Sequence, residues 1–546
     1  MSKGTAVACG VGLLTVLLAL AWPSARAVVA QPAEVRVTLF HDTHIHGNIQ
    51  GREGVTFAHY VGLMKKLRAE LPAPGQSLFV GNGDDIAAAA IAAPEREVFT
   101  APTLLTAVSD GQHTVDALNA AGIDATTLGY NEFDVGTDRL RQLLAGARYP
   151  YVTANLRDPR TGGAFGGEFG VRRWVIKEVG GVKVGLTGLA PVEPYLTGRA
   201  APDVRIMDPV EALREVLPEL RGAGADIVVL LSHLLPEDTE RVVAAVDGVD
   251  VSVGTHSMQV LDQPRSVGRT IISQRGSDLA LLGQLDLFVS GGRIVRYVYQ
   301  AHSVTPEAPA DPAIRAVVQE YLARAQAELA APAGTISAPL DTSRSVVWTG
   351  ESAAGNLVAD ALRAWAGADV ALHHGGYLGG QRTFGPGELT RRDVVELVPF
   401  VHAMVLRVNG AQLLAALENG VSRAPEEAAR FAHVSGMRFT YDPSLPAGGR
   451  IVSATVGQRS LDSAASYTLA TTDFVGLGLG GYDALQSAET VVPHTAGPTL
   501  VSIVLDYLAS RGGVDPAVEG RIRVAGAPAP APAQLPRALP HDGVDR

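Results

Sequence analysis

The sequence predicts a layered α/β protein of at least two domains. Short apolar runs of strand length alternate with segments of helical periodicity up to about residue 300, and this alternation is typical of sheets covered by helices. The chain has 546 residues, of which 47% are hydrophobic, and this length exceeds one ordinary core. Several predicted strands run directly into His, Asp or Asn, where open α/β sheets place functional groups.

The expected domain order follows from changes in composition and periodicity. Asp311 and Pro312 are a favourable N-cap and first helical residue, and apolar residues follow at helical spacing, so residues 311–329 are predicted to form a linker helix. We therefore expect a first α/β domain over residues 31–305, a linker over 306–333 and a second domain over 334–525. Residues 526–546 are rich in Pro and Ala without apolar periodicity, which predicts a disordered tail.

The first 30 residues have the composition of a secretory signal peptide. Lys3 precedes an apolar run over 11–22, and Ala25-Arg26-Ala27 is a small-x-small cleavage site. A membrane anchor is the alternative, but the run is short for a span and a cleavage site follows it. Cys9, the only cysteine, lies in this segment, which excludes disulfides and Cys-ligated zinc from the processed chain. We expect an exported protein, periplasmic, cell-surface or extracellular, that keeps no membrane span after cleavage.

The formal net charge of −11 disfavours one class of partner. DNA and RNA are bound chiefly through Lys and Arg, so a polymeric nucleic acid is not expected to bind this chain. A small anion such as a nucleotide remains compatible with the charge, because a metal site can supply positive charge locally.

Residues of the metal-ligand type follow five predicted strands. The first strand, at 35–40, leads into Asp42, His44 and His46, and the later ones lead into Asp84, Asn131, His233 and His256. Each alone is more often an ordinary loop or capping residue. Together, oxygen and imidazole ligands without sulfur suit Mn, Zn, Mg or Fe. A two-metal centre needs a shared carboxylate, for which Asp84 is predicted, with ions about 3.5–4 Å apart that clamp an in-line displacement at phosphorus.

The order and spacing of these motifs resemble the 5′-nucleotidase family, whose N-terminal domain is a calcineurin-like metallophosphoesterase. The matching segments are 41–47 (HDTHIHG), 83–84 (GD), 129–134 (GYNEFD), 231–233 (LSH) and 254–258 (GTHSM). The resemblance implies a four-layer αββα domain followed by a smaller α/β substrate-binding domain. It also implies two divalent metal ions and a bridging hydroxide that hydrolyse nucleoside monophosphates or 2′,3′-cyclic nucleotides.

The resemblance implies a ligand set, with some departures from the family pattern. Asp42, His44 and Asp84 would hold one ion, with His46 as the alternative to Asp42. Asp84, Asn131, His233 and His256 would hold the other. Tyr130 falls on the ligand Asn of the family, Asn131 on its catalytic His, and Met258 on a position that supplies a further ligand. A local shift of one residue would bring Asn131 to the metal, and Asn131 and Asp134 are the expected catalytic pair.

The second domain also resembles the family, in segments 351–357 (ESAAGNL), 398–400 (VPF), 434–442 (VSGMRFTYD) and 472–474 (TDF). The resemblance implies that Phe400 and Phe474 sandwich the nucleobase, although either ring could be plain core. Leu378 replaces the phosphate-clamping arginine, so Arg382 is the expected substitute, with a solvated loop arginine as the alternative. Gly480 replaces the Asp that holds the ribose hydroxyls.

These departures leave two other functions open. One is a phosphoesterase or sulfur-ester hydrolase that acts on a non-nucleotide substrate. The other is a catalytically impaired extracellular binding protein on the same scaffold.

Overall fold

The computed structural model describes residues 33–41, 44–51, 54–73, 75–86, 102–192, 196, 200, 202–254, 256–257, 259–274, 279–494 and 496–526, together with Met1. Most of the predicted signal segment, Asp42, Met258 and residues 527–546 of the predicted tail lie outside the described residues.

The N-terminal part of the chain alternates strands and helices, as the periodicity predicts. Its elements, with η for short 3-10 helices, are β1 (Val35–His41), α1 (Phe57–Glu70), β2 (Ser77–Val80), α2 (Pro102–Ser109), α3 (Gln112–Ala121), η1 (Asn131–Val135), α4 (Thr137–Gly146), β3 (Leu156–Arg157), η2 (Gly167–Phe169), β4 (Trp174–Val179), β5 (Val182–Leu189), β6 (Arg205–Ile206), α6 (Pro209–Gly222), β7 (Ile227–Ser232), α7 (Pro236–Ala245), β8 (Val251–Val253), β9 (Arg265–Val267), β10 (Thr270–Ser273), β11 (Leu281–Ser290) and β12 (Arg293–Ser303).

Two sheets pack face to face in this part of the chain. Their strand orders are β12-β11-β1-β2 and β4-β5-β7-β8-β10-β9. Alternation along β1 builds two cores, because successive side chains of a strand point to opposite faces. Val37 and Leu39 are buried against Val229 and Leu231 of the other sheet, whereas Phe40 packs into the cluster that contains the helices α1 and α3.

Helices cover the outer face of each sheet. Residues of α1, α3 and α8 bury their apolar sides in the cluster over β1 and β2. Leu213 of α6 and Val242 of α7 lie in the cluster over the second sheet. The result is the predicted four-layer αββα arrangement. β1 runs parallel to β2, and β5, β7, β8 and β10 run parallel to one another, so each set of parallel strands brings its carboxyl ends to one edge of its sheet.

The C-terminal part is a second α/β unit. Its elements are α8 (Pro312–Leu329), β13 (Pro332–Ile336), β14 (Leu340–Asp341), α9 (Arg344–Val347), α10 (Ala353–Ala366), β15 (Val370–His374), η3 (Gly375–Tyr377), β16 (Thr383–Phe384), β17 (Gly387–Thr390), α11 (Arg391–Leu397), β18 (Ala403–Asn409), α12 (Gly410–Gly420), β19 (Ala432–Ser435), β20 (Met437–Tyr441), β21 (Ile451–Val456), β22 (Arg459–Ser460), β23 (Ser466–Thr472), α13 (Asp473–Gly476), η4 (Leu479–Gly481), η5 (Asp483–Leu485), β24 (Glu489–Val492), α14 (Leu500–Arg511) and β25 (Ile522–Val524). A five-stranded sheet of order β19-β15-β23-β18-β24 forms its centre.

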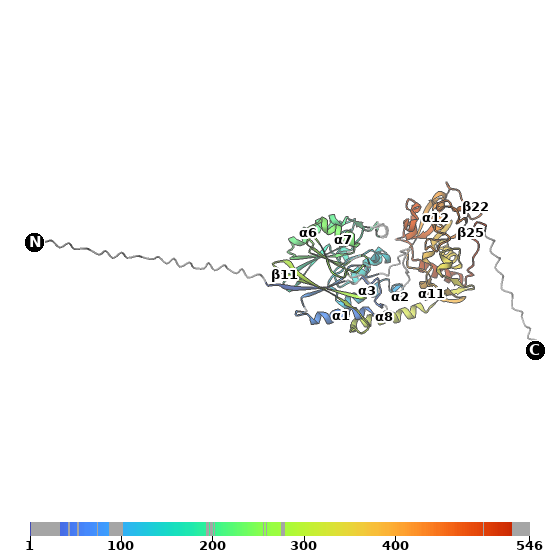
Figure 1. Ribbon diagram of the computed structural model, residues 1–546. Helices are drawn as coiled ribbons and strands as arrows, with labels where there is room; N and C mark the ends of the chain where they lie inside the picture. The colour runs from blue at the N-terminus through green and yellow to red at the C-terminus, as the bar shows by residue number, and fades with distance from the viewer. Residues whose placement is uncertain are drawn as a thin grey trace, which may run out of the picture.

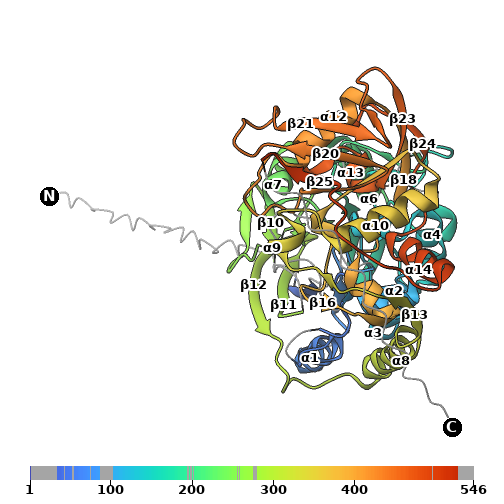
Figure 2. The same ribbon diagram turned by 90° about the vertical axis from the view of Figure 1, so that its right-hand side faces the viewer.

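The helix α8 joins the two units. Asp311 caps its N-terminus by accepting from the main-chain N–H of Ala313 and Ile314, as its sequence predicts. In Figure 1 the helix runs beneath both units, and Figure 2 shows it beside α3 and α2. Tyr321 of α8 donates to Asp116 of α3 at 2.6 Å, so α8 is fixed to the N-terminal unit. Among the described residues, no helix combines the length and apolarity that a membrane span requires.

Candidate metal centre

The ligand-type residues converge beyond the ends of four strands. His44 and His46 follow β1, and Asp84 follows β2. His233 follows β7, and His256 lies in the segment after β8. The parallel strands of the two packed sheets end at the same side of the domain, which is why residues almost 200 positions apart meet.

The first group consists of His44, His46 and Asp84. The Nε2 atoms of the two imidazoles lie 3.1 Å apart. They lie 3.7 Å and 3.8 Å from Oδ2 of Asp84. His46, the alternative to Asp42 in the sequence analysis, therefore belongs to the group.

The second group consists of Asp84, His233 and His256. Nε2 of His233 lies 3.0 Å from Oδ2 of Asp84 and 3.3 Å from Nδ1 of His256. The other ring nitrogen of His233 lies 2.6 Å from the main-chain oxygen of Asn82, which fixes the ring. Asp84 is thus the one carboxylate present in both groups of candidate ligands among the described residues.

The backbone at this site adopts a conformation that L residues rarely adopt. The φ angles of His44, His46 and Asp84 are 30°, 49° and 55°, in the left-handed region, which costs about 1–2 kcal/mol per residue. Main-chain hydrogen bonds hold the two loops together: His46 N–H donates to the oxygen of Asp84 at 2.8 Å, and Gly47 N–H to that of Asp85 at 2.9 Å. Strain retained in this way is typical of ligand-binding sites.

Glu132 organises the Asp84 loop, a role that the sequence analysis did not assign. Its buried carboxylate accepts from the main-chain N–H groups of Asp84 at 3.0 Å, Asp85 at 2.7 Å and Gly129 at 2.7 Å. Burial, followed by the charge of Asp84, raises the pKa of Glu132 to about 8. Its place between Asn131 and Asp134 in the segment 129–134 (GYNEFD) is the signal that could have identified it.

Gly129 lacks a side chain where Asp84 and His233 approach its backbone most closely. A Cβ atom at this position would lie 2.1 Å from Oδ1 of Asp84 and 2.8 Å from Cε1 of His233. No side chain fits there without moving one of the two residues.

The electrostatics divide the histidines into two kinds. Burial, followed by repulsion from neighbouring imidazoles, lowers the pKa of His44 to about 3 and that of His256 to about 4. Burial also opposes the charge of His233, but the Asp84 carboxylate outweighs it and raises the pKa of His233 to about 9. Burial would raise the pKa of Asp84, yet His233 holds it well below its usual range. The neutral imidazoles of His44 and His256 beside an ionised Asp84 are in the protonation state that a metal ion requires, whereas His233 carries a proton that a metal ion has to displace.

Asn131 and Asp134 form a pair beside these groups. Nδ2 of Asn131 donates to Oδ2 of Asp134 at 2.8 Å, and its main-chain N–H donates to Oδ1 of Asp84 at 2.8 Å. Oδ1 of Asn131 is buried and has no hydrogen-bond partner among the described residues. An amide oxygen left in this state fits a site for a divalent cation, alongside the imidazole and carboxylate donors. Its ligation remains a prediction.

Tyr130 packs on the second group of ligands. Its ring centroid lies 4.7 Å from that of His256, edge to face, and 6.1 Å from that of His233. Tyr130 therefore places an aromatic ring at the position that aligns with an asparagine ligand in the resembled family.

The predicted substrate-binding residues lie in different surroundings. Phe474 contacts the buried rings of His374, at a centroid distance of 5.4 Å, and Tyr377, at 6.3 Å. Phe400 lines a cavity of about 370 Å³ between the two units, together with Asp134. The guanidinium of Arg382 binds Asp393 at 2.6 Å and Glu396 at 2.8 Å, so two carboxylates already neutralise it.

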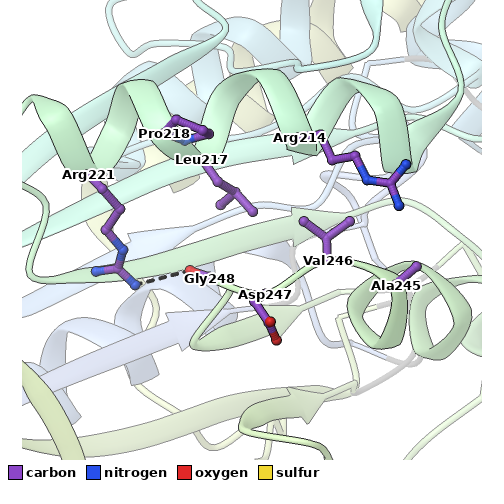
Figure 3. Close-up of a pocket in the computed structure, with 8 residues that line it drawn as sticks. All are labelled: Arg214, Leu217, Pro218, Arg221, Ala245, Val246, Asp247 and Gly248. Carbon is purple, nitrogen blue, oxygen red and sulfur yellow. Dashed lines mark hydrogen bonds between the residues drawn. The ribbon is translucent and has the colours of Figure 1, made fainter.

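A further hollow of about 410 Å³ lies between α6 and the turn after α7 (Figure 3). Arg221 at its edge donates to the main-chain oxygen of Gly248 at 3.1 Å and to Asp250 at 2.6 Å. Its guanidinium is thus used to hold the turn, and none of the predicted site residues lines this hollow.

Comparisons with known proteins agree with the motifs. Residues 332–487 match the profile of the 5′-nucleotidase C-terminal domain. A snake venom 5′-nucleotidase from Naja atra is 25% identical over 76% of this chain and 85% of its own length. The crystal structure of a 5′-nucleotidase precursor from Thermus thermophilus is 27% identical, with a TM-score of 0.57 over 90% of this chain and 100% of that one. The NAD nucleotidase of Haemophilus influenzae, 16% identical, shares the fold, with a TM-score of 0.58 over 90% of this chain and 99% of its own.

The motifs, the αββα architecture and these similarities together support the 5′-nucleotidase family and a phosphoric ester hydrolase.

Proposed function

We propose that this protein is an exported, metal-dependent phosphoesterase that hydrolyses nucleoside monophosphates or 2′,3′-cyclic nucleotides at a dinuclear centre. The observation that carries the proposal is the position of Asp84 between two pairs of imidazoles. A single carboxylate common to two ligand groups is the arrangement that holds two ions close enough to act on one phosphoryl group.

Each of the candidate site residues has a separate role in this proposal. His44, Asp84 and one of Asp42 or His46 would hold one ion, and Asp84, Asn131, His233 and His256 the other. The bound ions would supply Lewis-acid stabilisation of the phosphoryl oxygens. Asp134 fixes the amide of Asn131, and the second N–H of that amide is left to donate to the phosphoryl group. The ring of Tyr130 packs edge to face on His256 and would hold that ligand in place.

The C-terminal unit would bind the nucleoside. Support comes from the match of residues 332–487 to the C-terminal domain profile and from the half-buried ring of Phe474 beside His374 and Tyr377. Stacking of a base on an aromatic ring contributes about 1–3 kcal/mol and tolerates any base. Phe400 is proposed as the second ring. Arg382 would have to leave Asp393 and Glu396 to reach a phosphate.

The test is phosphate release from AMP, 2′,3′-cyclic AMP and an aryl phosphate after loading with Mn²⁺. We expect turnover of all three with the highest kcat/KM for a nucleotide. In Phe474→Leu the KM for AMP should rise about tenfold, whereas the KM for the aryl phosphate should stay constant. Turnover of the aryl phosphate without a nucleotide preference would instead support a phosphoesterase with another substrate. Bound metal without any turnover would support the impaired binding protein.

Export is proposed from the composition of residues 1–30 alone. Expression of the full chain with N-terminal sequencing of the exported product checks it. We expect a new N-terminus shortly after Ala27, and a protein that retains residues 1–30 would contradict export by cleavage.

A further inference from the structure

A histidine of the C-terminal unit forms a hydrogen bond with the loop that carries the proposed catalytic pair. Nε2 of His402 lies 3.1 Å from the main-chain oxygen of Asp134, and Nδ1 lies 2.9 Å from the main-chain oxygen of Gly497. Carbonyl oxygens only accept hydrogen bonds. A neutral imidazole has one N–H and can donate to only one of them, whereas an imidazolium donates to both.

The C-terminal unit holds His402 firmly. Its main-chain N–H lies 3.4 Å from Oδ2 of Asp473, and its main-chain oxygen accepts from Asp473 N–H at 2.8 Å. It also pairs with Thr499 in an antiparallel bridge. Asp473 is the first residue of α13, and Phe474 is the second. The backbone that places the imidazole therefore also places the predicted base-stacking ring.

On the other side of the boundary, Asp134 connects His402 to the candidate metal centre. Its main-chain oxygen faces His402, while its carboxylate accepts from Asn131. Asn131 in turn donates its main-chain N–H to Asp84. Three successive hydrogen bonds therefore link the C-terminal unit to the carboxylate that both ligand groups share.

Charged groups surround His402 in the cavity of about 370 Å³ that both units line. They are Asp110 after α2, Asp134 on η1 and Arg139 on α4, and Asp473 faces its main chain. Burial raises the pKa of Asp110, and Arg139 and His402 oppose this effect. Two carboxyl groups and one guanidinium therefore line the same cavity as the ring of His402.

We propose that His402 is a positioning residue for the reaction, and that its imidazolium form ties the C-terminal unit to the Asp134–Asn131 pair. The inference rests on the proposed function. With both carbonyls bound, the catalytic amide and the base-stacking ring keep a fixed separation. Loss of the proton leaves one carbonyl without its donor, so the separation is less well defined at higher pH.

The first test compares pH profiles of kcat/KM for AMP in the wild type, His402→Gln and His402→Phe. His302→Gln is the matched control, because His302 lies on β12 and bonds only Gln284 in the described chain. Relative to the wild type, we expect His402→Phe to lose about two- to tenfold below pH 6, with a smaller deficit above pH 8. His402→Gln, which keeps one N–H donor group, should show an intermediate loss. A deficit of equal size at every pH would overturn the proposal.

The second test does not depend on activity. The chain has Cys9 as its only cysteine, so in a Cys9→Ser background spin labels at Glu211→Cys and Ser463→Cys report only the separation of the two units. We expect the distance distribution of the wild type to broaden as pH rises, and that of His402→Phe to be broad at every pH. Identical distributions in both would overturn the positioning role. If no phosphoester is hydrolysed, the proposed function fails while these distances still decide the role of His402.

Discussion

The described residues include a cluster of histidines in each unit, and of these two clusters the N-terminal one has the ligand spacing of a metal site. His44, His46, His233 and His256 lie around Asp84. His373, His374 and His433 lie together in the C-terminal unit, where the rings of His373 and His433 stack at 5.3 Å. Both clusters consist of histidines, of which His46 and His256 are half-buried and the others are buried.

The direction of the ring nitrogens distinguishes them. In the N-terminal cluster they face one another and a carboxylate at 3.0–3.8 Å. In the C-terminal cluster, Nε2 of His373 lies 3.0 Å from the main-chain oxygen of Gly355, and Nε2 of His433 lies 2.8 Å from that of Val347. The described part of the C-terminal unit contains no group of His, Asp or Glu with ligand spacing.

Burial of several histidines together is therefore not enough to indicate a metal site. The ring nitrogens must also face a common carboxylate, as they do around Asp84. A ring nitrogen that already donates to a main-chain carbonyl is used in holding the fold. The comparison predicts large effects on metal binding from changes in the first cluster and effects on stability alone from changes in the second.

The largest effect is expected for Asp84→Asn. The amide keeps the shape of the side chain but removes the charge that both ligand groups share. We expect loss of bound metal and a fall in kcat of about 100-fold or more, since even a residue that only orients a ligand contributes 10–100-fold. Metal analysis and phosphate release check this. Full activity in a folded Asp84→Asn protein would remove Asp84 from the mechanism.

A similar loss is expected for Gly129→Ala, which changes no ligand. Its Cβ would lie 2.1 Å from Oδ1 of Asp84, so the carboxylate has to move. Gly146→Ala is the matched control, because the nearest atom to a Cβ there is 3.7 Å away. We expect metal affinity to fall at least about tenfold in the first variant and to stay unchanged in the second. Equal affinities by isothermal titration would show that the Asp84 loop adapts.

A moderate effect is expected from pH. In the metal-free protein Asp84 raises the pKa of His233 to about 9, so His233 carries a proton at pH 7 that a metal must displace. The affinity for Mn²⁺ should therefore rise between pH 7 and 9, by about tenfold per pH unit for one displaced proton. In His233→Asn the affinity should be weaker and its pH dependence shallower. A wild-type Kd that does not change over this range would argue against a charged His233.

The smallest effect on metal binding is expected for His433→Gln. The variant disturbs a buried hydrogen bond to Val347, so the free energy of unfolding should fall by about 1–3 kcal/mol. Denaturant unfolding measures this loss, and the metal content should match that of the wild type. A loss of metal without loss of stability would contradict the contrast between the clusters.

The sequence predicts the layered fold, and it singles out most residues of the candidate metal centre, for a physical reason. Strand periodicity places Val37 and Leu39 in the inter-sheet core, and the parallel order then brings the strand ends together. His44, Asp84, His233 and His256 could be identified because each follows a strand.

Other features depend on contacts that sequence spacing does not report. Glu132 accepts from the main-chain N–H groups of Asp84 and Asp85, which lie more than 45 positions away in the sequence. Gly129 is needed because a Cβ atom there would clash with Asp84. The contact of His46 with Asp84, at 3.8 Å, occurs at a residue whose φ is 49°, a conformation that sequence spacing does not report. Arg382, the residue before β16, likewise pairs with Asp393 and Glu396 of α11, a contact that sequence spacing does not report.

Anomalous diffraction from crystals loaded with Mn²⁺ shows whether Asp84 is shared by two ions. We expect two peaks on either side of the Asp84 carboxylate, one near His44 and one near His233. Peaks elsewhere, or no peak within coordination distance of Asp84, would contradict a metal centre at Asp84.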